Sequence, residues 1–355
     1  MSSTSVVAVL TVFGLAALGC AAVENEYPAS GGDSVSEGNP FFTESDLPFM
    51  LPRFDHIDDT HYRPAFEQGM ANHLAEIEAI VNATASPTFE NTVVQMERSG
   101  RLLTRVANVF FSLTSADTND TLDAIEVDIA PALAAHNDQI LLNDKLFERV
   151  KTLYDERDAL GLDAEALRLL EEYYTDFVRA GARASVAEKE RLKAINAELA
   201  TLGTAFSQNV LEEVNAAAVS VDTERELTGL SENEIAAAAE AAAARDAEGK
   251  YVIALLNTSG QPALSSLEDR ALRERIMTAS QSRGSQGGEF DNRDIVTRMA
   301  RLRAERAQVL GYPNHAAYIL ERQTAQTVDA VNERLASLTP PAVANARTEA
   351  VDLQA

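Results

Sequence analysis

The segment of residues 185–215 constrains the fold most, because it contains a single Gly, no Pro and an apolar stripe at three- and four-residue spacing. Such a stripe is typical of one face of an α-helix. Gly203 has no neighbouring Pro, so it does not predict a break. We expect one helix of about 30 residues, and a chain with only 17 Gly and 11 Pro in 355 residues should be mostly helical throughout.

The rest of the chain after residue 38 shows the same helical pattern. Asn119 and Asp163 are N-cap residues for two of the expected helices, and Gly181 is a C-terminal stop for the second. We expect helices within residues 91–113, 120–135, 164–180, 265–282, 292–310, 314–323 and 327–355. Two short strands, 218–221 and 251–256, flank a further helix at 231–245, which predicts a small two-stranded β insertion.

The first 38 residues read as an export signal followed by a tether. Residues 6–18 form an apolar run that is too short to span a bilayer but has the length of a secretory h-region. Cys20, the single Cys of the chain, follows this run directly, as in bacterial lipoproteins, where the Cys is lipidated. We expect a lipoprotein-type signal at 1–20 and a flexible tether at 21–38. A plain cleaved signal, or an apolar N-terminus with an incidental Cys, stays open.

Composition excludes several classes of function. The 30 Lys and Arg against 55 Asp and Glu give a net charge of −25, which argues against nucleic acid as a partner. One Cys excludes a disulfide framework and any CxxC zinc or redox site. The 46% hydrophobic content excludes disorder for the body of the chain.

A search for catalytic motifs finds none in these 355 residues. His56 and His61 lie in an acidic cluster, DHIDDTH. Because two residues five positions apart do not lie on the same face of a helix, we interpret the cluster as a surface loop and helix N-cap. His136 and His315 stand alone on expected helices and are interpreted as structural, and His73 has no motif around it. No His precedes Glu, so HExxH is absent, as are a phosphate-binding loop and a GxSxG elbow. The Gly-rich residues 284–288 follow a helix and are interpreted as a linker. We therefore assign no catalytic residue and no metal ligand.

Four segments, in order, resemble the N-terminal half of the zinc oligopeptidases (thimet oligopeptidase-like), and most closely the bacterial peptidyl-dipeptidase branch. They are FDHIDDTHYRPAFEQGM at 54–70, PTFENTVVQMERSGRLLTRVANVFFSLTSADTND at 87–120, LNTSGQPALSSLEDRALRERI at 256–276 and FDNRDIVTRMARLRAERAQVLGYPNHAAYILERQTAQT at 290–327. The resemblance covers about residues 39 to 355. Endopeptidases of the oligopeptidase A or thimet type share the last segment.

The resemblance implies the multi-helical N-terminal lobe of a two-lobed channel peptidase, with 39–284 as the N-terminal helical region and 285–355 as the start of the catalytic region. It implies a family-level zinc held by HExxH and a later Glu. None of those residues can be assigned to this chain, which we expect to be truncated before the zinc motif and inactive as given. The last helix contains Pro340 and Pro341, expected to kink or restart it, and ends without a stop signal.

Three functions stay open. The first is an exported zinc metallopeptidase that releases C-terminal dipeptides from short peptides. It would be monomeric when full length, in the bacterial periplasm or cell envelope, and attached to the membrane only through a lipid anchor. The alternatives are a non-catalytic, lipid-anchored helical peptide-binding protein and an endopeptidase of the oligopeptidase A or thimet type. If the other lobe is missing, apolar side chains along residues 328–351 should be exposed.

Overall fold

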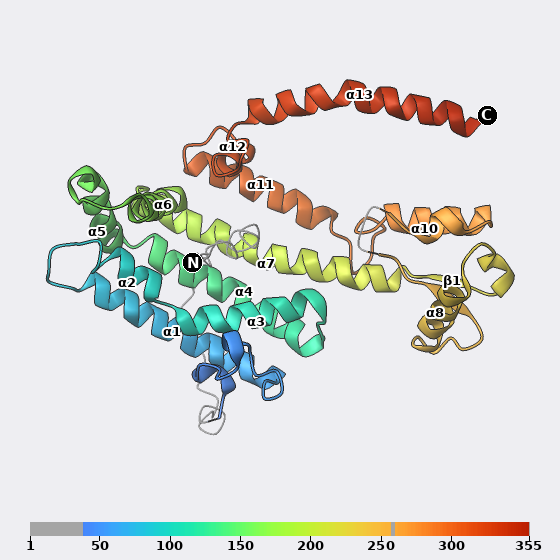
Figure 1. Cartoon of the computed structure of the whole chain (residues 1–355), viewed down its shortest axis with the longest axis horizontal. Helices are drawn as coiled ribbons and strands as arrows, with labels where there is room; N and C mark the ends of the chain where they lie inside the picture. Colours follow the sequence, from blue (N-terminus) through green and yellow to red (C-terminus); the bar gives the residue numbers. More distant parts are fainter. Residues whose placement is uncertain (1–37, 257–259, 355) are drawn as a thin grey trace.

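The computed structural model describes residues 38–256 and 260–354 and is mostly helical, as expected (Figure 1). Helices α1 to α7 span Tyr62–Val81, Val93–Arg98, Arg101–Ala116, Asp120–Leu141, Asp144–Asp155, Ala164–Ala180 and Val186–Ala216. Helices α8 to α13 span Glu232–Ala243, Ala263–Ser266, Arg270–Gln281, Arg293–Val309, His315–Leu320 and Val328–Gln354. None of these helices combines the length and the apolar character that crossing a membrane requires.

The long helix α7 is confirmed and forms the axis of the molecule. It begins with a capping box, in which the Ser185 N–H donates to the Glu188 carboxylate at 2.8 Å and the Ser185 hydroxyl accepts from the Glu188 N–H. Leu192 and Ile195 are fully buried on its inner face, and α7 packs against α4 and α11. In Figure 1, α7 runs from the bundle of α1–α6 to the unit that contains β1 and α8 at the opposite end.

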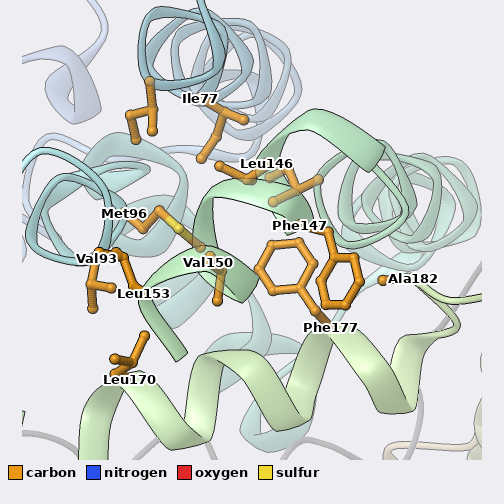
Figure 2. Packing of buried hydrophobic residues seen from close by; sticks show 12 residues of the cluster. Ile77, Val93, Met96, Leu146, Phe147, Val150, Leu153, Leu170, Phe177 and Ala182 are labelled. Carbon is orange, nitrogen blue, oxygen red and sulfur yellow. The ribbon is translucent and has the colours of Figure 1, made fainter. Parts of the chain in front are cut away.

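Two apolar cores hold the bundle of α1–α6 together. In the first, Phe147 of α5 lies 6.0 Å from Phe177 of α6, ring centre to ring centre, and Val150 and Leu170 are completely buried beside them (Figure 2). In the second, Phe66 of α1 meets Phe110 of α3 edge to face at 5.2 Å. Burial of these aromatic and aliphatic side chains is the main favourable term that fixes α1–α6 as one bundle.

The amphipathic segment 91–113 forms two helices rather than one. Helix α2 ends at Arg98 and α3 begins at Arg101, with Ser99 and Gly100 between them. Gly100 has a φ of 70°, a left-handed conformation that residues with a Cβ rarely adopt, and a Cβ there would lie 2.9 Å from the His73 Nδ1 atom. The periodic pattern did not reveal this corner, because apolar spacing continues through it.

The β insertion is confirmed, with shorter strands than the sequence suggests. Strand β1 (Val219–Val221) pairs antiparallel with β2 (Tyr251–Ile253), and Val221 lies opposite Tyr251. The buried Val221 and Val252 side chains and the α8 connection between the strands place the insertion at the end of α7. A two-stranded sheet is marginal on its own, so packing against helices stabilises it.

Helix α13 does not restart at its prolines. The helix is continuous through Pro340 and Pro341, and a kink there stays a prediction. Each Pro removes one N–H donor from the helix, and the carbonyl groups left over are tolerated because the residues around both prolines are exposed to solvent. The expected exposure of apolar side chains is confirmed: no residue of α13 is buried, and Leu335, Leu338, Val343 and Val351 are all exposed.

Gly229 should be the least replaceable Gly of the turn regions. A Cβ at Gly229 would lie 2.0 Å from the carbonyl oxygen of Ser266, whereas a Cβ at Gly249 meets nothing within 4 Å, although both residues have positive φ. Gly249→Ala should therefore cost about 1 kcal/mol of backbone strain, and Gly229→Ala at least about 2 kcal/mol, since backbone must also move. Urea unfolding of both variants measures the difference. Equal losses of unfolding free energy would contradict the close approach of Gly229 to the Ser266 carbonyl.

Candidate functional site

The sequence cluster around His56 and His61 is a loop and helix cap, as interpreted. The Asp58 carboxylate accepts from the Thr60 N–H at 2.9 Å, and the His61 Nδ1 atom accepts from the Asp58 N–H at 3.0 Å. His56 lies beside Asp55 and Arg53 at the surface. These contacts form a capping box at the turn that leads into α1 rather than a converging set of ligands.

The described residues do not fit a hydrolytic zinc site. Such a site needs three protein ligands and an open position for water. In the ranges 38–256 and 260–354, no group of three or more His, Cys, Asp or Glu side chains is placed so that it could hold a metal ion. We therefore derive no catalytic step through zinc on this chain. The candidate lipidation site, Cys20, lies outside the described residues.

His136 does not stand alone, contrary to its interpretation from the sequence. It is 2% exposed, and its Nε2 atom lies 2.9 Å from Nδ1 of His73 on α1. The two residues are 63 positions apart, so no local pattern could have found the pair. His315 is also half-buried, and burial together with Arg306 and Arg303 lowers its pKa.

A groove between α7, α10 and α11 is the candidate binding surface. Its volume is about 610 Å³, with Phe206, Val210 and Val296 supplying an apolar surface. Asn292 fixes one side of it, because its amide donates to the Phe206 carbonyl at 3.1 Å and its Oδ1 accepts from Asn209 at 3.0 Å. The rest of the lining is polar and comes from Ser280, Gln281, Arg283, Gly284, Arg293 and Thr297. An apolar surface with a hydrogen-bonding rim suits a peptide segment.

The Gly-rich residues 284–288, interpreted as a linker, lie between α10 and α11, and Gly284 lines this groove. The Gly284 N–H donates to the carboxylate of Glu213 on α7, which ties the turn to the long helix. Asp291 accepts from the Gly287 N–H at 2.7 Å and from Arg293, and these bonds lower the pKa of its carboxyl. The turn is therefore held by charge-assisted hydrogen bonds rather than being a loose connection.

A polar seam joins α11 and α12 to α6 and α7. Arg191 donates twice to Glu305, at 2.6 Å each, and Arg298 pairs with Glu198 in the same way. The second part of the seam centres on Arg179, whose guanidinium donates to the Tyr318 carbonyl at 2.7 Å and pairs with Glu321. Its Cζ atom lies 4.4 Å from the centre of the Tyr318 ring.

The seam includes one buried cation. Arg306 on α11 donates to the Asn196 side chain of α7 at 3.3 Å and lies over the Tyr318 ring. Burial lowers the pKa of this guanidinium. Tyr312 donates to Glu321 at 2.5 Å, and burial followed by this hydrogen bond raises its pKa to about 12. Arg306 is held by the Asn196 side chain and the Tyr318 ring, and Tyr312 by Glu321, so these groups fix the positions of α11 and α12.

Comparison with known proteins agrees with the family resemblance. Residues 263–355, which include α9–α13, match the model of Peptidase family M3. The chain is 43% identical over 316 residues to a dipeptidyl carboxypeptidase of Salmonella typhimurium, covering 89% of this chain and 46% of that protein. It is 41% identical over 317 residues to the dipeptidyl carboxypeptidase of Escherichia coli, with the same coverage. An oligopeptidase A of Salmonella typhimurium is 26% identical over 321 residues, again covering 89% of this chain and 46% of the relative.

These matches show which proteins the chain is similar to. The resemblance to the thimet-like oligopeptidases is confirmed, and the identity with the dipeptidyl carboxypeptidases exceeds that with the oligopeptidase A. The chain spans about half the length of the curated relatives that it matches. The groove and the seam both involve helices of the M3-matched part, since α10, α11 and α12 lie within it. The domain boundary at 284/285 stays a prediction.

The seam predicts that two arginines of α6 differ in how much their substitution lowers the free energy of unfolding. Arg179→Ala should lower the free energy of unfolding by about 1–3 kcal/mol, because it leaves the Tyr318 carbonyl without this donor and removes the ion pair of Glu321, which keeps only its hydrogen bond from Tyr312. Arg168→Ala removes an exposed pair with Glu172 and should cost less than about 0.5 kcal/mol. Urea unfolding measures both, and hydrogen exchange should show faster opening of α12 in the Arg179 variant alone. Similar losses in the two variants would refute the role of the seam.

Proposed function

We propose that this chain supplies the N-terminal, peptide-binding half of an M3-type peptidase that removes dipeptides from the C-terminus of short peptides. The observation that carries the proposal is 43% identity over 89% of the chain to a dipeptidyl carboxypeptidase. Identity this high, spread over most of the chain, supports a shared fold and a shared role for this half.

The parts of the activity divide between this chain and residues it does not contain. The described residues offer the groove of α7, α10 and α11 for a peptide and the seam that holds those helices in register. The family-level zinc, with its HExxH motif, is assigned to sequence beyond the 355 residues, because no His in them precedes Glu. The chain by itself is therefore proposed to be inactive.

A chimera tests this division of roles. Residues 1–355 are joined to the part of the Salmonella dipeptidyl carboxypeptidase that follows the matched region, and the product is assayed with a quenched peptide whose C-terminal dipeptide can be released. We expect chelator-sensitive release by the chimera and neither cleavage nor stoichiometric zinc for the 355-residue chain alone. Chelator-sensitive cleavage by the chain alone would refute the proposal. Peptide binding without cleavage, in a folded chimera, would favour the non-catalytic alternative.

Two variants of the chimera test the groove itself. Val296→Glu places a carboxylate in the groove, and Val186→Glu places the same charge on an exposed site at the start of α7, away from the groove. We expect the first to raise KM several-fold while kcat changes little, since it weakens substrate binding, and the second to leave both unchanged. An unchanged KM in the Val296 variant would remove the groove from the proposed site.

We also propose that the chain is exported and anchored in the cell envelope through Cys20. The apolar run at 6–18, the position of the single Cys and the polar residues that follow support this. Mass spectrometry of the membrane fraction should find an N-terminal peptide that begins at a diacylglyceryl-modified Cys20, and Cys20→Ser should move the protein out of that fraction. A soluble product that begins at another residue would contradict the anchor without touching the peptidase proposal.

A further inference from the structure

A continuous series of hydrogen bonds links the buried His136 and the half-buried His73 to the corner between α2 and α3. Nε2 of His136 lies 2.9 Å from Nδ1 of His73, and Nε2 of His73 lies 3.1 Å from the Ser99 hydroxyl. The Ser99 hydroxyl donates to the Met96 carbonyl at 2.7 Å. These hydrogen bonds thus connect α4, α1 and the α2–α3 corner, which are three separate parts of the sequence.

The last bond fixes the direction of all the others. The Ser99 hydroxyl has one proton, which goes to Met96, so the oxygen can only accept from the Nε2–H of His73. A neutral His73 with its proton on Nε2 has an acceptor at Nδ1, which must receive the Nε2–H of His136. His136 is then neutral with a bare Nδ1. That atom is buried and has no hydrogen-bond partner among the described residues.

The opposite direction is less favourable. If Ser99 donated to His73, and His73 to His136, the proton of neutral His136 would lie on Nδ1, where a buried N–H would have no acceptor. The opposite direction would also break the hydrogen bond from the Ser99 hydroxyl to the Met96 carbonyl. Unpaired buried N–H groups are rarer and more costly than an under-used acceptor. The geometry therefore selects one tautomer for each ring.

An additional proton on either imidazole ring would disrupt this series of hydrogen bonds. On His73 it would sit on Nδ1, facing the N–H of His136 at 2.9 Å, and on His136 it would sit on the partnerless Nδ1. Gly100 packs against the His73 ring, where an added Cβ would lie 2.9 Å from Nδ1. Protonation of either ring therefore breaks the hydrogen bond between His73 and His136 that joins α1 to α4.

The charged groups around the pair do little to offset this. Burial lowers the pKa of His73, and Glu76 on α1 raises it, with its carboxylate also accepting from the Gly100 N–H at 2.7 Å. Arg98 of α2 lines the same pocket as Glu76 and Ser99. Charged groups on the neighbouring helices have partners of their own, namely Arg149 of α5 with Asn91, Lys189 of α7 with Asp144, Glu97 of α2 with Tyr173 of α6, and Asp138 of α4 with Asn196 of α7.

We propose that Ser99, His73 and His136 form an acid-sensitive latch, whose hydrogen bonds link α1, α4 and the α2–α3 corner only while both imidazoles are neutral. This inference does not rest on the proposed peptidase function. The latch would lower the stability of the α1–α6 bundle as the pH falls below neutral and restore it at neutral pH.

The pH range of the latch follows from the pKa values. Burial, and then the neighbouring His73, lowers the pKa of His136 from 6.5 to about 4, and burial also lowers that of His73. A histidine with a lower pKa in the folded chain binds fewer protons when folded than when unfolded. Stability is therefore full above pH 6.5 and falls as the pH drops towards 4, by up to about tenfold in the folding equilibrium constant per pH unit and histidine.

The test compares the full chain with two glutamine variants. His136→Gln keeps an N–H donor for His73 Nδ1 but cannot take up a proton, and His56→Gln removes an exposed histidine as the matched control. Urea midpoints are measured from pH 4.5 to 8. We expect the wild type and His56→Gln to lose stability together below pH 6.5, and His136→Gln to lose clearly less. Identical pH slopes in all three proteins would overturn the latch.

Ring nitrogen NMR of the wild type tests the latch without any variant, which matters if His136→Gln does not fold. At pH 7.5, His136 should carry its proton on Nε2 and His73 on Nε2, and neither ring should titrate near 6.5 in the native state. The opposite tautomer of His136, or titration of either ring at its ordinary pKa, would overturn the proposal.

Discussion

The structure depends on the burial of one face of α7 against α4 and α11. With 31 residues and a rise of 1.5 Å per residue, α7 is about 46 Å long and links the two ends of the molecule. Leu192 and Ile195 leave water completely on this face, and each such side chain contributes about 1.5–3 kcal/mol. The bundle, the β insertion and the groove take their positions from this one rigid element.

Polar contacts fix the position of residues 263–355, the part that matches Peptidase family M3, relative to α7. The apolar contact between α7 and α11 centres on Ile195, Leu199 and Leu302, which is a small cluster. Around it, paired carboxylates and guanidinium groups fix the register, because such bidentate pairs require one geometry. The groove proposed for peptide binding lies between the same two helices and α10, so its shape depends on this register.

Helix α13 shows the opposite situation, with an amphipathic sequence and no surface to cover. Its apolar side chains Leu335, Leu338 and Val343 are exposed, and an exposed patch of this kind is typical of an interaction surface. The helix belongs to the part that matches Peptidase family M3, and the relatives are about twice as long as this chain.

The helical class, the bounds of α7 and the N-caps Asn119 and Asp163 could be predicted from the sequence, because these depend on neighbours within a few residues. The β insertion could be predicted from two strand-like segments, although their pairing joins residues 30 or more positions apart. Four ordered segments also indicated the family. The break at Gly100, the His73–His136 pair and the Arg179 contacts could not be predicted, because they depend on contacts between residues up to 142 positions apart. Hydrophobic periodicity records which face of a helix is buried, but not which distant side chain lies against it, and that is why both the seam and the latch were invisible before the fold was known.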